Sequence, residues 1–262
     1  MKKPKRKNKM KNDPWKAIFD AYRVLDHDFD TSPFIVTAKQ IKDVAKDFSS
    51  TSEREVRTLC KQDTREDRPE IFAENGLFIL PIRNGKYVIV KGEGYVDIPP
   101  INGATITYAS KLDFQPDTSC IGDSEMQHLD FAYATSLVRT FLQDESLVLT
   151  IRGRKYTPKF SFNVGTHEIT TEGVQTEVDA GYEGKKQVVL MEAKNSKTIN
   201  VIIRQLFYPF RQWQQHTEKP VKTLFFEKRG DLYSLWQFAF GDPENYNSIK
   251  LERSQGYKIV WQ

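Results

Sequence analysis

The chain has 262 residues, of which 39% are hydrophobic and 28% charged, and its formal net charge is +4. This composition is typical of a soluble globular protein with one large domain or two modest ones. It contains no apolar run near the ~20 residues of a membrane span and no secretory signal. The isolated Cys60 and Cys120 indicate no disulfide framework, so we expect a reducing, cytoplasmic setting.

The first twelve residues are strongly basic, with seven Lys or Arg residues and no acid. Subtracting these seven charges from the total of +4 leaves a net charge of −3 on the rest of the chain. We predict that residues 1–12 form a disordered tail; a loose tether to nucleic-acid phosphates is the alternative. The slightly acidic body gives no argument of its own for nucleic-acid binding.

Helix signals follow this tail. Asp13 can cap a helix whose first position suits Pro14, and a second helix is expected to start near Thr37. Ser52 and Glu55 have the spacing of a capping box, which predicts a third helix over residues 52–62.

A hairpin comes next. Strand-like runs at residues 77–82 and 87–91 flank Asn84-Gly85, a strong turn signal. Three helices followed by a hairpin is the order of a winged helix, in which the helix over residues 52–62 would enter the major groove. That helix offers four side chains to DNA, namely Arg54, Arg57, Lys61 and Gln62. A small helical domain without a role in DNA binding is the alternative.

The run Ile98-Pro99-Pro100-Ile101 marks a domain boundary. We therefore predict a winged-helix domain over residues 13–97 and a second domain over residues 98–262. Helical periodicity covers residues 124–142 and 199–216, and strand patterns cover residues 147–152, 159–164, 176–180, 187–193, 222–228, 233–240 and 257–260. The expected fold class is α+β or α/β, with a mixed β-sheet flanked by helices.

Two strand ends of the second domain carry the chemistry. Val188 to Met191 is typical of a strand buried on both faces. Glu192 and Lys194 end it and point to the same side. Asp179 ends the preceding strand, and the turn between them could place it beside Glu192. Carboxylates and carbonyl oxygens are the ligands that Mg²⁺ prefers.

These residues suit phosphodiester hydrolysis. Mg²⁺ held by Asp179, Glu192 and the carbonyl of Ala193 would neutralise the scissile phosphate and help to form the hydroxide nucleophile. Lys194 would orient or help to deprotonate the water and offset charge in the transition state. The alternative is a surface ion pair that closes a hairpin, as the similar run Glu183-Gly184-Lys185 in a solvated turn illustrates.

Asp179 followed by Glu192-Ala193-Lys194 resembles the signature of the PD-(D/E)xK nuclease superfamily, with Val178 in place of the proline. Further runs resemble a group of type II restriction endonucleases: Asp63-Thr64-Arg65-Glu66, the segment 75–81, Ser124-Glu125-Met126-Gln127, Thr157-Pro158-Lys159-Phe160 and the segment 203–211. The resemblance implies Mg²⁺-dependent, sequence-specific cleavage of double-stranded DNA by a homodimer, as part of a restriction-modification system.

The resemblance adds candidates around the core triad. A helical acid at the place of Glu125 often joins the metal site in this superfamily, although a first-turn acid also suits the helix dipole. Gln205 and Tyr208 share a helix face and resemble a Gln-x-x-x-Tyr motif with one residue fewer. Arg204 and Arg211 could face phosphates or simply solvent. Glu177 shares a strand face with Asp179, as a second ligand or a structural residue. Pro209 is expected to kink or break the helix.

The sequence thus predicts a type II restriction endonuclease. Two alternatives stay open: a repair or structure-selective nuclease of the same superfamily, and a non-enzymatic winged-helix regulator that binds DNA without cutting it.

Overall fold

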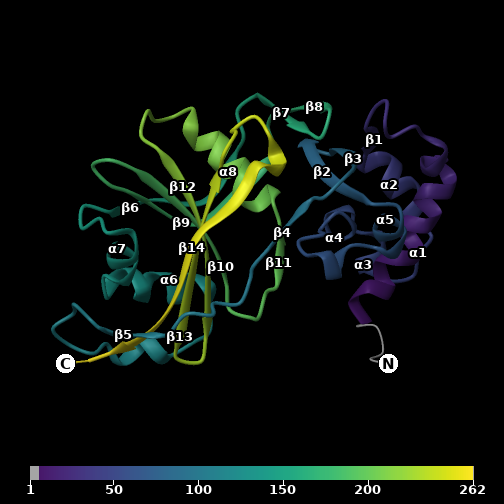
Figure 1. The fold of residues 1–262 in the computed structure, drawn as a ribbon. Coiled ribbons are helices and arrows are strands. Elements are labelled where there is room, and N and C mark those ends of the chain that lie inside the picture. Colours follow the sequence, from purple (N-terminus) through teal and green to yellow (C-terminus); the bar gives the residue numbers. More distant parts are fainter. Residues whose placement is uncertain (1–5, 262) are drawn as a thin grey trace.

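The computed structural model describes residues 6–261, and the side chains from residue 11 onward except that of Cys120. Figure 1 shows a smaller N-terminal part beside a larger part built around a long sheet. None of the helices in the described range combines the length and the apolar character that crossing a membrane requires.

The N-terminal part consists of short helices packed on a small antiparallel sheet. Its sheet has the order β1-β3-β2. The elements in chain order are α1 (Arg6–Ala21), β1 (Phe34–Thr37), α2 (Ala38–Ala45), α3 (Thr51–Arg54), α4 (Val56–Leu59), α5 (Glu70–Glu74), β2 (Leu77–Arg83) and β3 (Lys86–Lys91). The predicted hairpin is confirmed, because β2 pairs with β3 and Gly85 has φ +69° in the turn. Thr37 caps α2 in a capping box with Gln40.

Two N-terminal predictions are wrong. Residues 52–62 do not form one helix, because Glu55 is extended and separates α3 from α4, and the capping box joins Ser50 to Glu53 instead. Residues 6–12 belong to α1 rather than to a disordered tail. Tertiary contact explains the second difference, since the buried Asn12 accepts a hydrogen bond from the backbone N–H of Glu70. Residues 1–5 of the predicted tail lie outside the described range.

The larger part is organised by a seven-stranded sheet of order β5-β14-β13-β12-β10-β9-β6. Its strands are β5 (Ile106–Ala109), β6 (Val148–Tyr156), β9 (Gln175–Glu183), β10 (Val188–Lys194), β12 (Val221–Arg229), β13 (Leu232–Phe240) and β14 (Ile249–Val260). The pairs β10–β12 and β14–β5 are parallel and the others antiparallel, so the predicted mixed sheet is confirmed.

Helices cover both faces of this sheet. On one face, α6 (Glu125–Ala134) and α7 (Leu137–Leu142) pack over Val189, Met191 and Ala193. On the other face lies α8 (Arg204–Gln214), near Val188 and Leu190. Successive side chains of β10 point to these two faces in turn, and both faces are buried. The strand is therefore apolar from Val188 to Met191. The predicted helix over residues 124–142 is divided at Ser136, which has φ +65°. Helix α8 continues through Pro209 and is not broken there.

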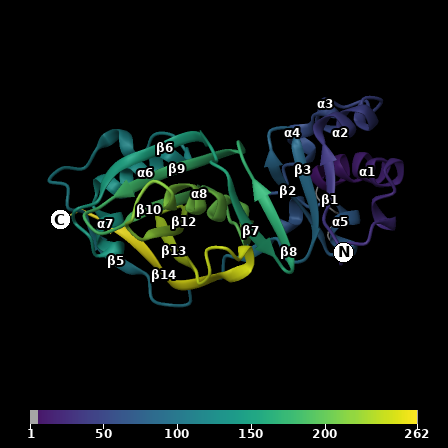
Figure 2. The ribbon, with the colours of Figure 1, turned by 90° about the horizontal axis from the view of Figure 1, so that it is seen from above.

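The two parts share an apolar core. The hairpin of β7 (Phe160–Val164) and β8 (His167–Thr171) extends from the larger part to β2 (Figure 2). There, Phe162 packs with Phe78 of β2, Phe207 of α8 and Tyr246 in one buried cluster. A short ladder between β4 (Tyr95–Asp97) and β11 (Asn200–Ile202) adds backbone hydrogen bonds beside it.

Candidate active site

The candidate site lies where two paired strands separate. Strands β9 and β10 pair from Val188 opposite Glu183 to Met191 opposite Ala180, and the pairing ends before Asp179. On its other side, β10 stays paired with β12 as far as Lys194. The Asp179 carboxylate occupies the opening and accepts a hydrogen bond of 2.8 Å from the N–H of Ala193. The side chain thus replaces the backbone partner that this N–H would otherwise lack.

Glu192 is the most buried acid of the site, with 8% of its surface exposed. Its Oε1 accepts hydrogen bonds from Lys194 Nζ at 2.5 Å and from Gln205 Nε2 at 2.9 Å. Burial raises the pKa of Glu192 to about 7, because removal from water outweighs the attraction of Lys194. Such a displaced pKa at a polar opening is typical of functional sites.

Lys194 remains an ammonium at neutral pH. Burial lowers its pKa, but the nearby carboxylates, of which Glu192 acts most strongly, together outweigh burial, and the net shift is upward. The ammonium also donates to the carbonyl of Ala193 at 2.9 Å. A lysine with a raised pKa is a poor proton acceptor, so the arrangement favours the electrostatic role predicted for Lys194 over removal of a proton from water.

Asp179 is shielded from water in the same way. Burial raises its pKa, and the hydrogen bond from Ala193 and the charge of Lys194 counteract this shift only in part. The three predicted catalytic residues are therefore brought together around the backbone of Ala193, as their order in the sequence indicates.

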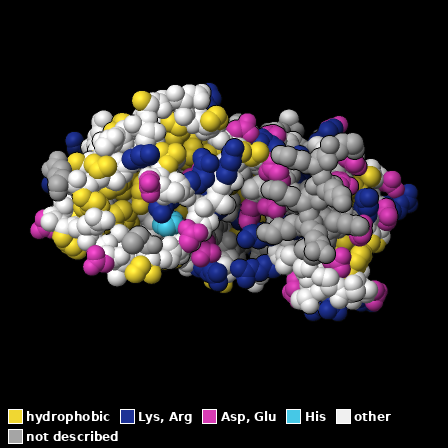
Figure 3. Space-filling model, turned by 90° about the horizontal axis from the view of Figure 1, so that it is seen from below, with side chains coloured by type: hydrophobic (Ala, Val, Ile, Leu, Met, Phe, Trp, Pro, Cys, Tyr) yellow, Lys and Arg dark blue, Asp and Glu magenta, His cyan; other side chains and the backbone are white. Residues whose placement is uncertain are grey.

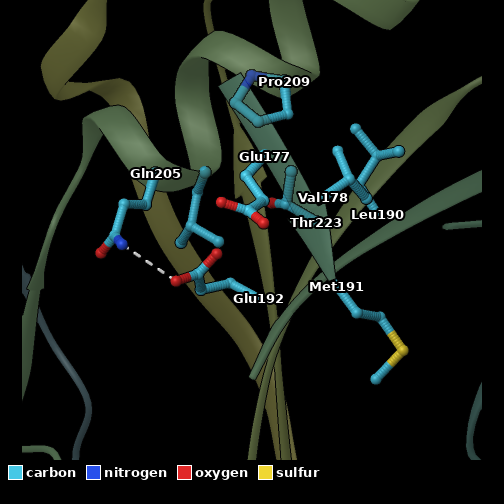
Figure 4. Close-up of a pocket in the computed structure, with 9 residues that line it drawn as sticks. Glu177, Val178, Leu190, Met191, Glu192, Gln205, Pro209 and Thr223 are labelled. Atoms are coloured by element: carbon cyan, nitrogen blue, oxygen red, sulfur yellow. Dashed lines mark hydrogen bonds between the residues drawn. The ribbon is translucent and has the colours of Figure 1, made fainter. Parts of the chain in front are cut away.

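A small pocket adjoins Glu192 on the side of α8. Its free volume is about 10 Å³, enough for roughly one water molecule. Glu177 and Glu192 both line it, and Figure 4 shows their carboxylates directed into it, with Gln205 bonded to Glu192 from α8. Glu177 is also paired with Arg154 at 3.3 Å, on the exposed side. The accessory residues Glu177 and Gln205 are thus both at the site.

Glu125 is also placed near the triad. It is the first residue of α6, half-buried, and its charge raises the pKa of Lys194. The loop before α6 is held to the end of β10, because Asn195 Nδ2 donates to the carbonyl of Asp123 at 2.8 Å. Glu125 therefore borders the ammonium side of the site.

Several other predicted residues lie elsewhere. Tyr208 is buried in the shared core and donates to the carbonyl of Pro81, because it lies on the face of α8 opposite to solvent. Arg211 donates to the carbonyl of Pro243 and lies over the Phe160 ring, so it does not share a solvent face with Arg204. Arg204 instead pairs with Asp63 at 3.6 Å.

The predicted DNA-contact residues of the N-terminal part divide into two groups. Arg54, Arg57 and Lys61 are exposed. Gln62 is 1% exposed, so it cannot reach DNA from this position. The helical pattern that suggested Gln62 as a surface residue does not apply, because α4 ends at Leu59.

The donor set fits Mg²⁺. Across the described residues, no three His, Cys, Asp or Glu side chains could hold a metal ion by themselves. Mg²⁺, however, is usually bound through one or two carboxylates, with waters and substrate phosphates completing its shell. Within residues 6–261, Oδ1 of Asp179 and Oε2 of Glu192 take no hydrogen bond, and the Ala193 carbonyl lies beside them.

Two residues near the site had no role in the sequence analysis. Asp63 of the N-terminal part is close enough to raise the pKa of Glu192. Glu227 lies opposite Lys194 on β12, is 2% exposed, and accepts a hydrogen bond from the N–H of Thr198 in the loop after Lys194. The run Asp63-Thr64-Arg65-Glu66 was noted only as part of a resemblance, and no local pattern indicates that Asp63 lies near enough to Glu192 to raise its pKa.

Comparisons with known proteins give two family matches. Residues 90–258 match the family described as a domain of unknown function, DUF6997, and residues 12–89 match a second such domain, DUF6996. No curated protein and no solved structure matched the chain.

Proposed function

The chain belongs to the DUF6997 family, and we propose that it is a metal-dependent endonuclease that cuts double-stranded DNA. One observation carries the proposal: Asp179, Glu192 and Lys194 meet around Ala193 where β9 and β10 separate. Their supporting frame is α6, the antiparallel strands β6, β9 and β10, then α8 and the parallel strand β12. This order supports membership of the PD-(D/E)xK superfamily.

The protein side chains have distinct roles in this proposal. Asp179, Glu192 and the carbonyl of Ala193 would hold Mg²⁺, which when bound would offset the charge of the scissile phosphate and acidify a water molecule. Lys194 presents a permanent positive charge to the same phosphate and stabilises the charge that develops in the transition state. Gln205 holds the Glu192 carboxylate in place from α8.

We propose that the N-terminal part binds DNA together with the candidate active site. The order helix, strand, helix, helical segment and hairpin, with β1 paired to β3, supports a winged helix. Segments α3 and α4, which carry Arg54 and Arg57, lie in the lower half of Figure 1, as does α6. Where the face seen from below shows described residues, Lys and Arg side chains are interspersed with acidic ones (Figure 3).

We further propose a type II restriction endonuclease that acts as a homodimer. A palindromic duplex presents its two scissile bonds related by a two-fold axis, and two copies of one site match that symmetry. The restriction class rests on the resemblance of sequence runs. A structure-selective nuclease of the same superfamily and a non-cutting DNA-binding regulator are the competing functions that the experiment must separate.

The test is cleavage of unmethylated phage DNA with Mg²⁺ or EDTA by the wild-type chain, Lys194→Ala and Lys197→Ala. Lys197 is an exposed lysine three residues further along and serves as the matched control. We expect discrete fragments from the wild type and Lys197→Ala with Mg²⁺ only. Loss of one transition-state donor should reduce the rate of Lys194→Ala by about 100- to 1,000-fold.

Other outcomes identify the alternatives. Full activity of Lys194→Ala would refute the site. Cutting confined to nicked, flapped or branched DNA would favour a structure-selective nuclease. DNA that is retarded on a gel but stays intact, in both unmethylated and methylated form, would favour the regulator.

A further inference from the structure

A loop of the N-terminal part is bonded to the strand that precedes α8. We call residues 62–66 the junction loop. Its Asp63 carbonyl accepts from the N–H of Ile202 at 2.8 Å, and the N–H of Arg65 donates to Oδ1 of Asn200 at 2.7 Å. Asn200 Nδ2 donates in return to both carboxylate oxygens of Glu66, at 3.0 and 3.2 Å. Asn200 is 2% exposed, so these bonds are shielded from water.

The same loop reaches the first turn of α8. The Asp63 carboxylate is paired with Arg204 at 3.6 Å, and the side chains are 17% and 22% exposed. A half-buried pair of this kind is less screened than a surface pair and constrains its partners more. Because β11 ends at Ile202 and α8 begins at Arg204, the backbone bond and the ion pair fix the start of the helix from two directions.

The residue after Arg204 connects this start to the candidate site. Gln205 donates to Glu192, which is the buried acid of the triad. The other amide atom of Gln205, Oε1, is buried and has no hydrogen-bond partner among the described residues. The amide is therefore held at the site by its bond to Glu192 and by the position of the helix that carries it.

We propose that Asp63 is a positioning residue, which sets the first turn of α8 through Arg204 and thereby holds Glu192 in its active geometry. This inference rests on the proposed nuclease function.

The test compares single-turnover cleavage by the wild type, Asp63→Ala and Asp97→Asn. Asp97 is the matched control, because its ion pair at the same junction is with Arg65 and not with a residue of α8. We expect a rate for Asp63→Ala lowered by about 10- to 100-fold, as small misplacements of reacting groups cause. Its affinity for the same DNA, measured without Mg²⁺, should stay within about twofold of wild type, and Asp97→Asn should retain the wild-type rate.

Two further variants separate positioning from damage to the fold. Asp63→Glu keeps the carboxylate and should recover most of the rate, whereas Asp63→Asn keeps the shape and should not. Arg204→Ala added to Asp63→Ala should lower the rate no further, because each change breaks the same ion pair between Asp63 and Arg204. An unchanged rate in Asp63→Ala, beside an inactive Lys194→Ala, would overturn the inference and leave the proposed function intact.

A wild type that cuts no DNA would refute the nuclease, and hydrogen exchange would then still test whether Asp63 fixes the first turn of α8. Amides 202–208 should then exchange several-fold faster in Asp63→Ala than in Asp97→Asn. Equal exchange in the two variants would overturn the inference.

Discussion

Glu192 is the residue at which stability and the proposed function conflict. An acid that is 8% exposed loses most of its hydration, and the ammonium of Lys194 compensates for only part of this loss. The folded chain therefore holds a proton on Glu192 more tightly than the unfolded chain does. A group retained under such a cost is a strong candidate for a functional role.

This cost predicts how stability depends on pH. The pKa of Glu192 rises from 4.5 to about 7 on folding, so its contribution to stability is complete below about pH 4.5 and is lost as the pH rises through 7. Glu192→Gln should therefore have a higher unfolding temperature than wild type at pH 8 without metal. At pH 4.5 the two should be nearly equal. Thermal unfolding at both pH values measures the effect.

Glu218→Gln is the control for this prediction. Glu218 is exposed, and its replacement by Gln removes the same charge as Glu192→Gln does. It should leave the unfolding temperature nearly unchanged at both pH values. A wild type more stable than Glu192→Gln at pH 8 would contradict the argument, and would mean that Lys194 stabilises the carboxylate more than burial disfavours it.

At the scale of elements, the separation of β9 from β10 depends on close packing on the other side of β9. Gly181 is paired with Ile151 of β6, and a Cβ at this glycine would lie 2.6 Å from the Cβ of Ile151. Only glycine therefore allows β6 to approach β9 two residues after Asp179. The pairing fixes the strand that presents this carboxylate.

We predict that Gly181→Ala destabilises the chain by about 1–3 kcal/mol, as overpacking of a close contact does. The unfolding temperature should fall by several degrees, and cleavage should fall with it because β9 must shift. Gly103→Ala is the control, because no atom lies within 4 Å of a Cβ there. Equal unfolding temperatures for the two variants would show that β6 and β9 have room to separate.

At the scale of the whole molecule, the shared apolar core predicts that the two parts unfold together. Phe78 belongs to the N-terminal part, whereas Phe162, Phe207 and Tyr246 belong to the larger part, and all four are at most 1% exposed. The ring centroids of Phe162 and Phe207 are 5.1 Å apart, and the Phe78 ring stacks on that of Tyr246 with centroids 5.9 Å apart. Large apolar interfaces of this kind oppose independent domain motion.

Calorimetry of the full chain should therefore show one unfolding transition. Phe162→Ala should lower its midpoint, with a loss of about 3–5 kcal/mol, and should not divide it into two. Two well-separated transitions in the wild type would refute a shared core. The family matches meet between residues 89 and 90, within β3, and the shared core extends across that division.

The sequence by itself determined the features that depend on near neighbours. Asn84-Gly85 set the hairpin, Thr37 began α2, and alternating or continuous apolar runs marked most strands, because turn geometry and strand period are local properties. The order Asp179, Glu192, Lys194 also indicated the candidate triad, since residues two apart on a strand share a face.

Only the tertiary structure decided the surroundings of that triad. From distant positions in the chain, Gln205 donates to Glu192 and Asp63 raises its pKa. Gln62 and Tyr208 are buried where local patterns indicated surface or site. Helical periodicity could not reveal the extended Glu55 between α3 and α4. The physical reason is that burial and long-range pairing depend on which elements pack together, and one segment's residues do not encode the partner that will cover them.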